Sequence, residues 1–259
     1  TVTGSFLQNG AGSSVLGGDL TGTAGLTFQR GIVLTGNDAV TLATGGATGE
    51  DLLLGTAGAV TDVEGGGQAL VLDAGVGGDL TLRGALGRLD APLGAVTFTS
   101  ADQALLTGML SATSWTQSGA PASGATTLAG TVVLTGNLTF TGQDLTLSGR
   151  ANEVGGSLTV TNAGTWTTAD TADLTVNGAV SQGGAGAVTL GADLTSTTAG
   201  ISFAEAVTLA STDTVLLTTG GGAGDDLTFN STLGVNANES LTVDAGASGD
   251  LGVTGAVTL

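Results

Sequence analysis

Hydrophobic and polar positions alternate along this chain in many short runs. One aliphatic residue, a threonine, and a second aliphatic residue or a phenylalanine form a unit that recurs from end to end. An alternation of period two places neighbouring side chains on opposite faces of a β-strand, so each unit predicts a short strand with its threonine outward. The units are 26–28, 40–42, 80–82, 96–98, 138–140, 145–147, 158–160, 174–176, 188–190, 207–209, 227–229, 241–243 and 257–259.

Glycine-rich corners separate these strands, for example at 45–51, and no helical pattern lies between them. Closely spaced strands without helices favour coils wound around one core. We predict an all-β fold, a right-handed parallel β-helix (β-solenoid), as a single domain over residues 1–259. At roughly 20 residues per coil it makes about a dozen coils. Tandem immunoglobulin-like sandwiches are the competing fold, but their strands are longer and no linker is visible here.

A longer repeat lies over the short one. Residues 200–251 repeat residues 25–80, and a shift of 175 pairs Asp38 with Asp213. Residues 108–127 are the least regular part of the chain and predict a loop or an altered rung. We expect Trp166 to pack in or against the core.

Composition narrows the functional classes. The 22 acidic and 4 basic residues give a net charge of −18, which repels nucleic acid and anionic membrane surfaces. The absence of His, Cys and Lys removes histidine acid–base chemistry, thiol chemistry and Schiff bases. No apolar run approaches the roughly 18 residues of a membrane span, so we expect no membrane insertion. We expect the chain not to be an enzyme.

Aspartate precedes leucine eight times, and two interpretations compete. The carboxylates could form a ladder that binds Ca²⁺, or each could accept hydrogen bonds from backbone amides at a turn, which we favour. The segment 221–226 also resembles the start of a nonapeptide calcium repeat, so Asp225 and Asp226 are the candidate Ca²⁺ ligands. No other cofactor is expected. The eight residues are Asp19, Asp51, Asp79, Asp144, Asp173, Asp193, Asp226 and Asp250.

Three asparagines begin glycosylation sequons: Asn137, Asn230 and Asn238. In a chain this rich in Asn and Thr, coincidence is the simpler reading. A carbohydrate-active β-helix enzyme would need clustered acids and aromatic platforms, whereas this chain offers only Trp115 and Trp166 as tryptophans. That enzyme class is the least favoured alternative.

The repeat style resembles a known group of proteins. In segments 78–82, 92–101 and 215–221 the chain is similar to giant bacterial β-strand-repeat surface proteins, relatives of filamentous-haemagglutinin and autotransporter-type adhesins. The resemblance implies a secreted β-helical shaft that serves in adhesion, biofilm matrix or surface fibres. It carries over no catalytic residues.

The two ends suggest self-assembly. No polar or helical cap precedes the first predicted strand or follows the last, and an uncapped solenoid exposes its core and backbone. We expect an extracellular filament or matrix fibre whose subunits stack head to tail, with cell-surface glycans or matrix components as further partners. The alternative is a shaft segment excised from a long secreted adhesin. The expected interface residues are Thr1, Val2, Thr3, Ala256, Val257, Thr258 and Leu259.

Overall fold

The computed structural model describes residues 1–56, 62–118, 124–235 and 239–258. These residues form β-strands and turns, with no helix among them. The chain divides into two compact units, Thr1–Leu134 and Thr135–Leu259. Every pair of strands is parallel, and the chain makes about 11 turns of a β-solenoid. The predicted parallel β-helix is therefore confirmed.

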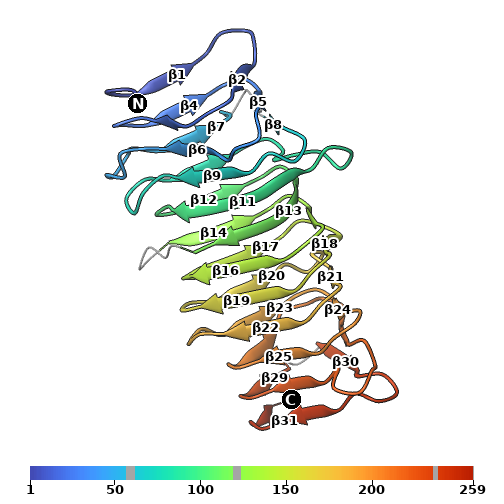
Figure 1. Cartoon of the computed structure of the whole chain (residues 1–259). Helices are drawn as coiled ribbons and strands as arrows, with labels where there is room; N and C mark the ends of the chain where they lie inside the picture. The colour runs from blue at the N-terminus through green and yellow to red at the C-terminus, as the bar shows by residue number, and fades with distance from the viewer. Residues whose placement is uncertain (57–61, 119–123, 236–238, 259) are drawn as a thin grey trace. The chain divides into compact units, whose positions relative to one another are not determined.

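In the first unit, each turn carries three strand positions, and equivalent strands of successive turns stack into columns (Figure 1). The second column continues from β8 to β13 through bridges at Leu86, and β13 takes part in the second and third columns. The first column is β1 (Phe6–Gln8), β4 (Leu26–Phe28), β7 (Leu52–Leu54), β10 (Leu80–Leu82), β12 (Ala104–Leu106) and β14 (Ala125–Leu128). The second is β2 (Ser14–Leu16), β5 (Ile32–Leu34), β8 (Val63–Glu64), β13 (Leu110–Gln117) and β15 (Val132–Leu134). The third is β3 (Leu20–Thr21), β6 (Val40–Ala43), β9 (Leu70–Asp73), β11 (Leu93–Ser100) and β13.

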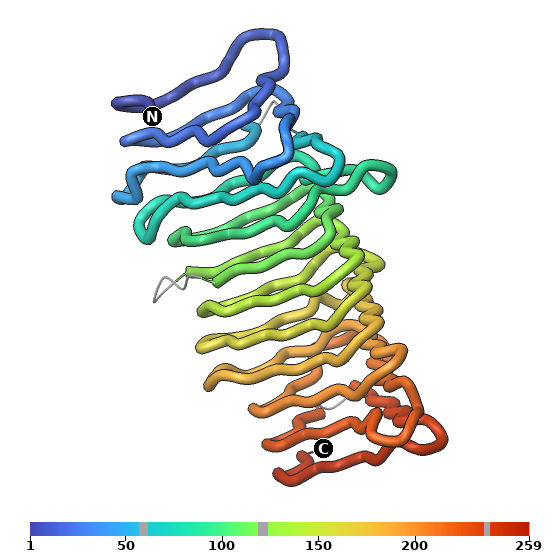
Figure 2. The backbone as a smooth tube through the Cα atoms, in the orientation of Figure 1, coloured from blue at the N-terminus to red at the C-terminus, as the bar shows by residue number. Residues whose placement is uncertain are grey.

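The second unit repeats this arrangement, and its backbone can be followed turn by turn in Figure 2. One column is β17 (Asp144–Leu147), β20 (Trp166–Thr168), β23 (Val188–Leu190), β26 (Val207–Leu209), β29 (Leu233–Gly234) and β32 (Val257–Thr258). The next is β18 (Asn152–Val154), β21 (Leu174–Val176), β24 (Leu194–Ser196), β27 (Thr214–Thr218) and β30 (Ser240–Asp244). The last is β16 (Leu138–Gly142), β19 (Leu158–Asn162), β22 (Val180–Gly183), β25 (Ile201–Phe203), β28 (Leu227–Phe229) and β31 (Leu251–Val253).

The core follows from the period-two pattern. In β4, Leu26 and Phe28 are fully buried while Thr27 is only partly covered, and most strands repeat this pattern. Aromatic side chains stack between turns of the second unit, where the rings of Phe203 and Phe229 lie 5.4 Å apart. Trp166 is fully buried, as expected. Inward residues of successive turns thus form continuous apolar columns.

Glycine corners allow the turns to approach closely. Gly46 and Gly75 have φ values of 85° and 71°, and a Cβ on Gly75 would overlap the Cα of Gly46. The pair Gly221 and Gly246 has the same arrangement, with φ values of 76° and 71°. Only glycine adopts such φ values at little cost and leaves room for the neighbouring backbone. The two copies of the sequence repeat therefore have the same corner geometry.

The described residues of segment 108–127 include β13, an eight-residue strand that takes part in two columns, and β14. Trp115 lies on β13 and packs edge-on against Phe98, with ring centroids 5.4 Å apart. Its sequence lacks the aliphatic–Thr–aliphatic unit because β13 bends from one column to the next, which breaks the simple alternation. Residues 119–123 lie outside the described part.

The repeat is longer than the sequence comparison indicated. Residues 8–21 match 182–195 at nine of fourteen positions, so the paired segments extend to the first turn. Gln8 and Gln182, which this match pairs, make similar contacts, and Gln182 in addition donates to the side chain of Asn162. Each side-chain oxygen accepts two amides of the next turn, and each side-chain nitrogen donates to carbonyls of its own corner. The five differences include Ser14 against Val188, at an inward position, and so interrupt the hydrophobic pattern.

Candidate functional site

The aspartates that precede strands join one turn to the next. Seven of the eight accept a hydrogen bond from the backbone amide at the equivalent position of the following turn, about 20 to 28 residues later. The pairs are Asp19 with Thr41 (2.8 Å), Asp51 with Asp79 (3.0 Å), Asp79 with Gln103 (3.2 Å), Asp144 with Thr165 (2.5 Å), Asp173 with Asp193 (3.3 Å), Asp193 with Leu216 (2.8 Å) and Asp226 with Asp250 (2.9 Å).

This position needs an acceptor for a physical reason. The residue before a strand lies at the end of the parallel ladder, and its amide is accepted there by a carboxylate oxygen of the preceding turn. A buried backbone amide without an acceptor is costly, and a charged acceptor makes a strong hydrogen bond. The sequence correctly suggested that these aspartates bind backbone amides. The amide, however, belongs to the next turn, which sequence spacing alone does not identify.

The candidate calcium residues already have protein partners. Asp225 accepts the amide of Gly222 at 2.8 Å, and Asp226 accepts the amide of Asp250 at 2.9 Å. Glu50 of the first unit accepts the Ala47 amide at 2.8 Å, in the same way as Asp225. Within the described residues, no group of three or more acidic side chains is arranged to hold a metal ion. Calcium binding there stays a prediction.

Electrostatic repulsion within the carboxylate ladder is visible at Asp79. Burial raises the pKa of Asp79, and the neighbouring charge of Asp51 raises that pKa further. Asp79 accepts a hydrogen bond from the amide of Gln103, and this bond lowers the pKa and so opposes the shift. The ionised form of Asp79 is therefore less favourable in the folded state than in the unfolded chain.

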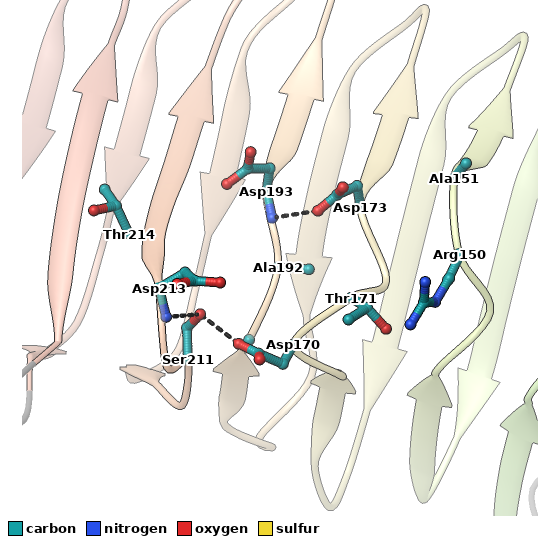
Figure 3. Close-up of a pocket in the computed structure, with 11 residues that line it drawn as sticks. Arg150, Ala151, Asp170, Thr171, Asp173, Ala192, Asp193, Ser211, Asp213 and Thr214 are labelled. Carbon is teal, nitrogen blue, oxygen red and sulfur yellow. Dashed lines mark hydrogen bonds between the residues drawn. The ribbon is translucent and has the colours of Figure 1, made fainter.

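A polar pocket of about 430 Å³ opens in the second unit where one corner is short (Figure 3). Gly191 and Ala192 line this pocket. The side chain of Asp170 extends past them to Ser211, two turns further along the solenoid. Its carboxylate accepts hydrogen bonds from the hydroxyl of Ser211 at 2.6 Å and from the amide and hydroxyl of Thr212 at 3.0 and 2.8 Å. These bonds lower the pKa of Asp170, and the bond from Ser211 contributes most.

Two other carboxylates of this pocket also join turns. Asp173 and Asp193 each accept an amide of the following turn, whereas the amide of Asp213 donates to Ser211 within the same corner. Arg150 lies at one end of the pocket (Figure 3). The sequence did not indicate this pocket, because it arises from unequal corner lengths in adjacent turns.

The sequon asparagines have different surroundings. Asn137 is exposed, and its side-chain oxygen accepts the amide of Ser157 at 2.9 Å, so it acts like the aspartates of the ladder. Asn230 is exposed after β28. Asn238 lies outside the described residues. Whether any of the three carries a sugar stays a prediction.

The expected interface residues lie in the first and last turns. Thr1, Thr3, Ala256 and Thr258 are exposed, and Val2 is partly covered. Val257 and Leu251 are each 53% exposed, although both stand at inward positions, paired with Leu233 and Leu227. Leu259 lies outside the described residues. The last turn therefore presents core side chains to solvent, together with the outer edges of β31 and β32.

Comparison with known proteins adds no relative: no protein-family model, curated protein or solved structure matches the chain. In the described residues, no helix has the length and apolar character needed to cross a membrane. Function must therefore be argued from the solenoid and its exposed surfaces.

Proposed function

We propose that this chain is a structural protein of an extracellular bacterial filament or matrix fibre, in which β-solenoid subunits stack head to tail. One observation carries the proposal: the chain makes about 11 turns of a parallel β-solenoid, and within each unit the turns are joined by a backbone ladder and by columns of buried apolar side chains. A solenoid of this kind is consistent with a structural repeat protein.

Stacking of subunits would use the same kinds of contact that join the turns within each unit. A further turn would extend the backbone ladder and continue the apolar columns. A subunit contact that does not close on itself repeats without limit, which produces a fibre. The acidic surface, with its net charge of −18, would keep neighbouring fibres apart in solution.

The second candidate is the shaft of a long secreted adhesin. A regular solenoid of about 11 turns favours it equally, because such a shaft needs a stiff rod and no active site. In that case the remainder of the adhesin binds the receptor. A carbohydrate-active enzyme is less favoured, since the carboxylates of the ladder already accept backbone amides.

Electron microscopy and light scattering of the purified chain test the proposal over a range of concentrations. We expect fibres whose length and scattered intensity rise with concentration, and a chelator added to a matched sample reports whether Ca²⁺ contributes. Single rods at every concentration would contradict head-to-tail assembly and favour the adhesin shaft. Hydrolysis of a soluble glycan would instead favour the enzyme.

A further inference from the structure

A short hairpin, residues 87–92, projects from the wall of the first unit (Figure 2). Arg88 and Ala91 form an antiparallel bridge whose two hydrogen bonds measure 3.3 and 3.2 Å, which places Leu89 and Asp90 at the tip. Leu89 is 66% exposed. The strands on either side of the hairpin, β10 and β11, pair with strands of the turns before and after. The hairpin therefore belongs to an inner turn of the solenoid.

Neighbouring turns hold this hairpin in one conformation. From the preceding turn, the amide of Gly67 donates to the carbonyl of Pro92 at 2.9 Å. From the following turn, the hydroxyl of Ser111 donates to the carbonyl of Arg88 at 2.9 Å. A loop that is already fixed loses little conformational freedom when it binds a partner. The tip is therefore well suited to an intermolecular contact.

The hairpin tip carries an apolar side chain between two opposite charges. The guanidinium of Arg88 lies 3.2 Å from the carboxylate of Asp90 and 3.5 Å from that of Glu64, and all three side chains are largely exposed. Ion pairs this exposed to water contribute little to stability. Arg88 and Asp90 can therefore exchange them for partners on another molecule at low cost.

The polar pocket of the second unit has the complementary charges. Figure 3 shows Arg150 at one end of the pocket and Asp213 towards the other. Among the described residues, the carboxylate of Asp213 accepts no hydrogen bond, and only one oxygen of Asp193 accepts one. Between these ends the pocket is lined by the small residue Ala192. Its volume of about 430 Å³ lies within the range of pockets that hold small ligands or side chains.

We propose that the hairpin tip of one molecule docks in this pocket of a second copy. The contact joins two molecules side by side, and it does not depend on head-to-tail assembly. It pairs Arg88 with Asp213, Leu89 with Ala192, and Asp90 with Arg150.

Charge is the argument for a second copy as the partner. At a net charge of −18, most of the surface of one molecule repels another, so association needs a place where unlike charges meet. Arg88 is one of only four basic residues in the chain, and it lies beside the exposed tip. The pocket, with four aspartates and one arginine, attracts such a cation, while its arginine accommodates the carboxylate of the tip.

A contact made by one hairpin buries little surface, so we expect weak and reversible association. Disulfide cross-linking captures such a contact, and the chain contains no cysteine of its own. Leu89→Cys and Thr171→Cys, both at exposed positions, are mixed and oxidised, and peptide mapping locates the disulfide. Thr171 lies beside Arg150 in the pocket (Figure 3). We expect a covalent dimer that joins position 89 of one copy to position 171 of the other.

The matched control is Val76→Cys mixed with Thr171→Cys. Val76 is another aliphatic residue of the first unit and is 69% exposed, close to the value for Leu89, but it lies on a different corner. We expect no dimer from this mixture. A cross-link at position 76 as abundant as that at position 89 identifies random collision and overturns the proposal.

Charge reversal tests the pairing within the contact. Arg88→Asp, added to the molecule with the cysteine at position 89, is expected to lower the cross-link yield about tenfold, because like charges then meet. Asp213→Arg in the pocket molecule is expected to restore the yield, and on its own to lower the yield obtained with the parent hairpin. Asp38→Arg is the control, since Asp38 corresponds to Asp213 in the sequence repeat but lies outside the pocket. It is expected to restore nothing.

The remaining outcomes also decide the question. No cross-link between positions 89 and 171 overturns the contact, even where fibres form. A cross-link that Arg88→Asp leaves unchanged overturns it as well, because another surface then brings the two positions together. Arginine amide serves as a probe for a small cation: if it protects the Thr171→Cys thiol from alkylation in a sample that gives no cross-link, the pocket holds a small ligand and the proposal fails. Cross-linked pairs without fibres support the contact and contradict head-to-tail assembly.

Discussion

Replacement of Gln182 by leucine tests how strongly one buried side chain joins neighbouring turns. The side chain is 4% exposed. Its oxygen accepts the amides of Ala204 and Glu205 at 3.1 and 3.2 Å, and its nitrogen donates to Asn162 at 2.9 Å and to Gly186 at 2.8 Å. Leucine has a similar volume but can make none of these bonds.

The expected loss follows from these contacts. A hydrogen bond contributes about 1 kcal/mol net, and a buried partner left without one costs about 1 to 3 kcal/mol. With these bonds and a further one to the carbonyl of Gly183 lost, we expect the free energy of unfolding to fall by about 3 to 5 kcal/mol. Gln8→Leu is the matched control, because Gln8 makes equivalent bonds in a first turn that is only partly covered. Solvent can reach the groups left there, so the expected loss is about 1 to 2 kcal/mol.

The assay is denaturant unfolding combined with hydrogen exchange. The midpoint and slope give the change in free energy. Exchange at the amides of Ala204 and Glu205 reports whether the loss is local. A loss for Gln182→Leu below about 1 kcal/mol, or one no larger than that for Gln8→Leu, would refute the reasoning that buried corner amides join the turns.

Three further predictions concern charge and backbone. Asp79 has a raised pKa, so its ionised form opposes folding and the protein gains stability as the pH falls through that pKa. Asp79→Asn is therefore expected to be more stable than the parent at neutral pH, with less dependence on pH in urea unfolding, and a less stable variant contradicts this. Asp170 has a lowered pKa, so it contributes stability above its unfolded pKa that is lost as the pH falls through the lowered one. Asp170→Asn should lower the unfolding midpoint at pH 7 and leave it little changed in strong acid. Gly75→Ala should cost more than about 1 kcal/mol, because φ is positive and the Cβ overlaps a neighbouring turn. Gly66→Ala, with open space around its Cα, is the control, and equal melting temperatures would contradict the overlap.

Much of the fold could be predicted from local pattern. The alternation in segments such as 26–28 and 207–209 identifies both the strands and their inward residues, because side-chain direction in a strand depends only on position along it. The pattern failed at β13, where Trp115 and its neighbours lie on a strand that bends between columns. It also missed the first part of the repeat, where Ser14 stands against the buried Val188 and interrupts the hydrophobic pattern.

The candidate sites were harder to predict because they depend on contacts between turns. The sequence identified Asp51 and Asp226 as residues that bind backbone amides, but it placed the amide in the same corner. Turns vary in length, from 18 residues between Ser14 and Ile32 to 31 between Ile32 and Val63. A residue's neighbour on the next turn therefore cannot be found by counting.

By itself, the sequence determined that this protein is all-β, repetitive and parallel, because a period of two and glycine corners act within a few residues. Only the tertiary structure decided which turn each carboxylate joins, which corner is short enough to open the pocket beside Asp170, and which core residues the last turn leaves exposed. Those features depend on the register of the stack. The register is the sum of all corner lengths and the packing of every turn on the one before it, so no local segment contains it.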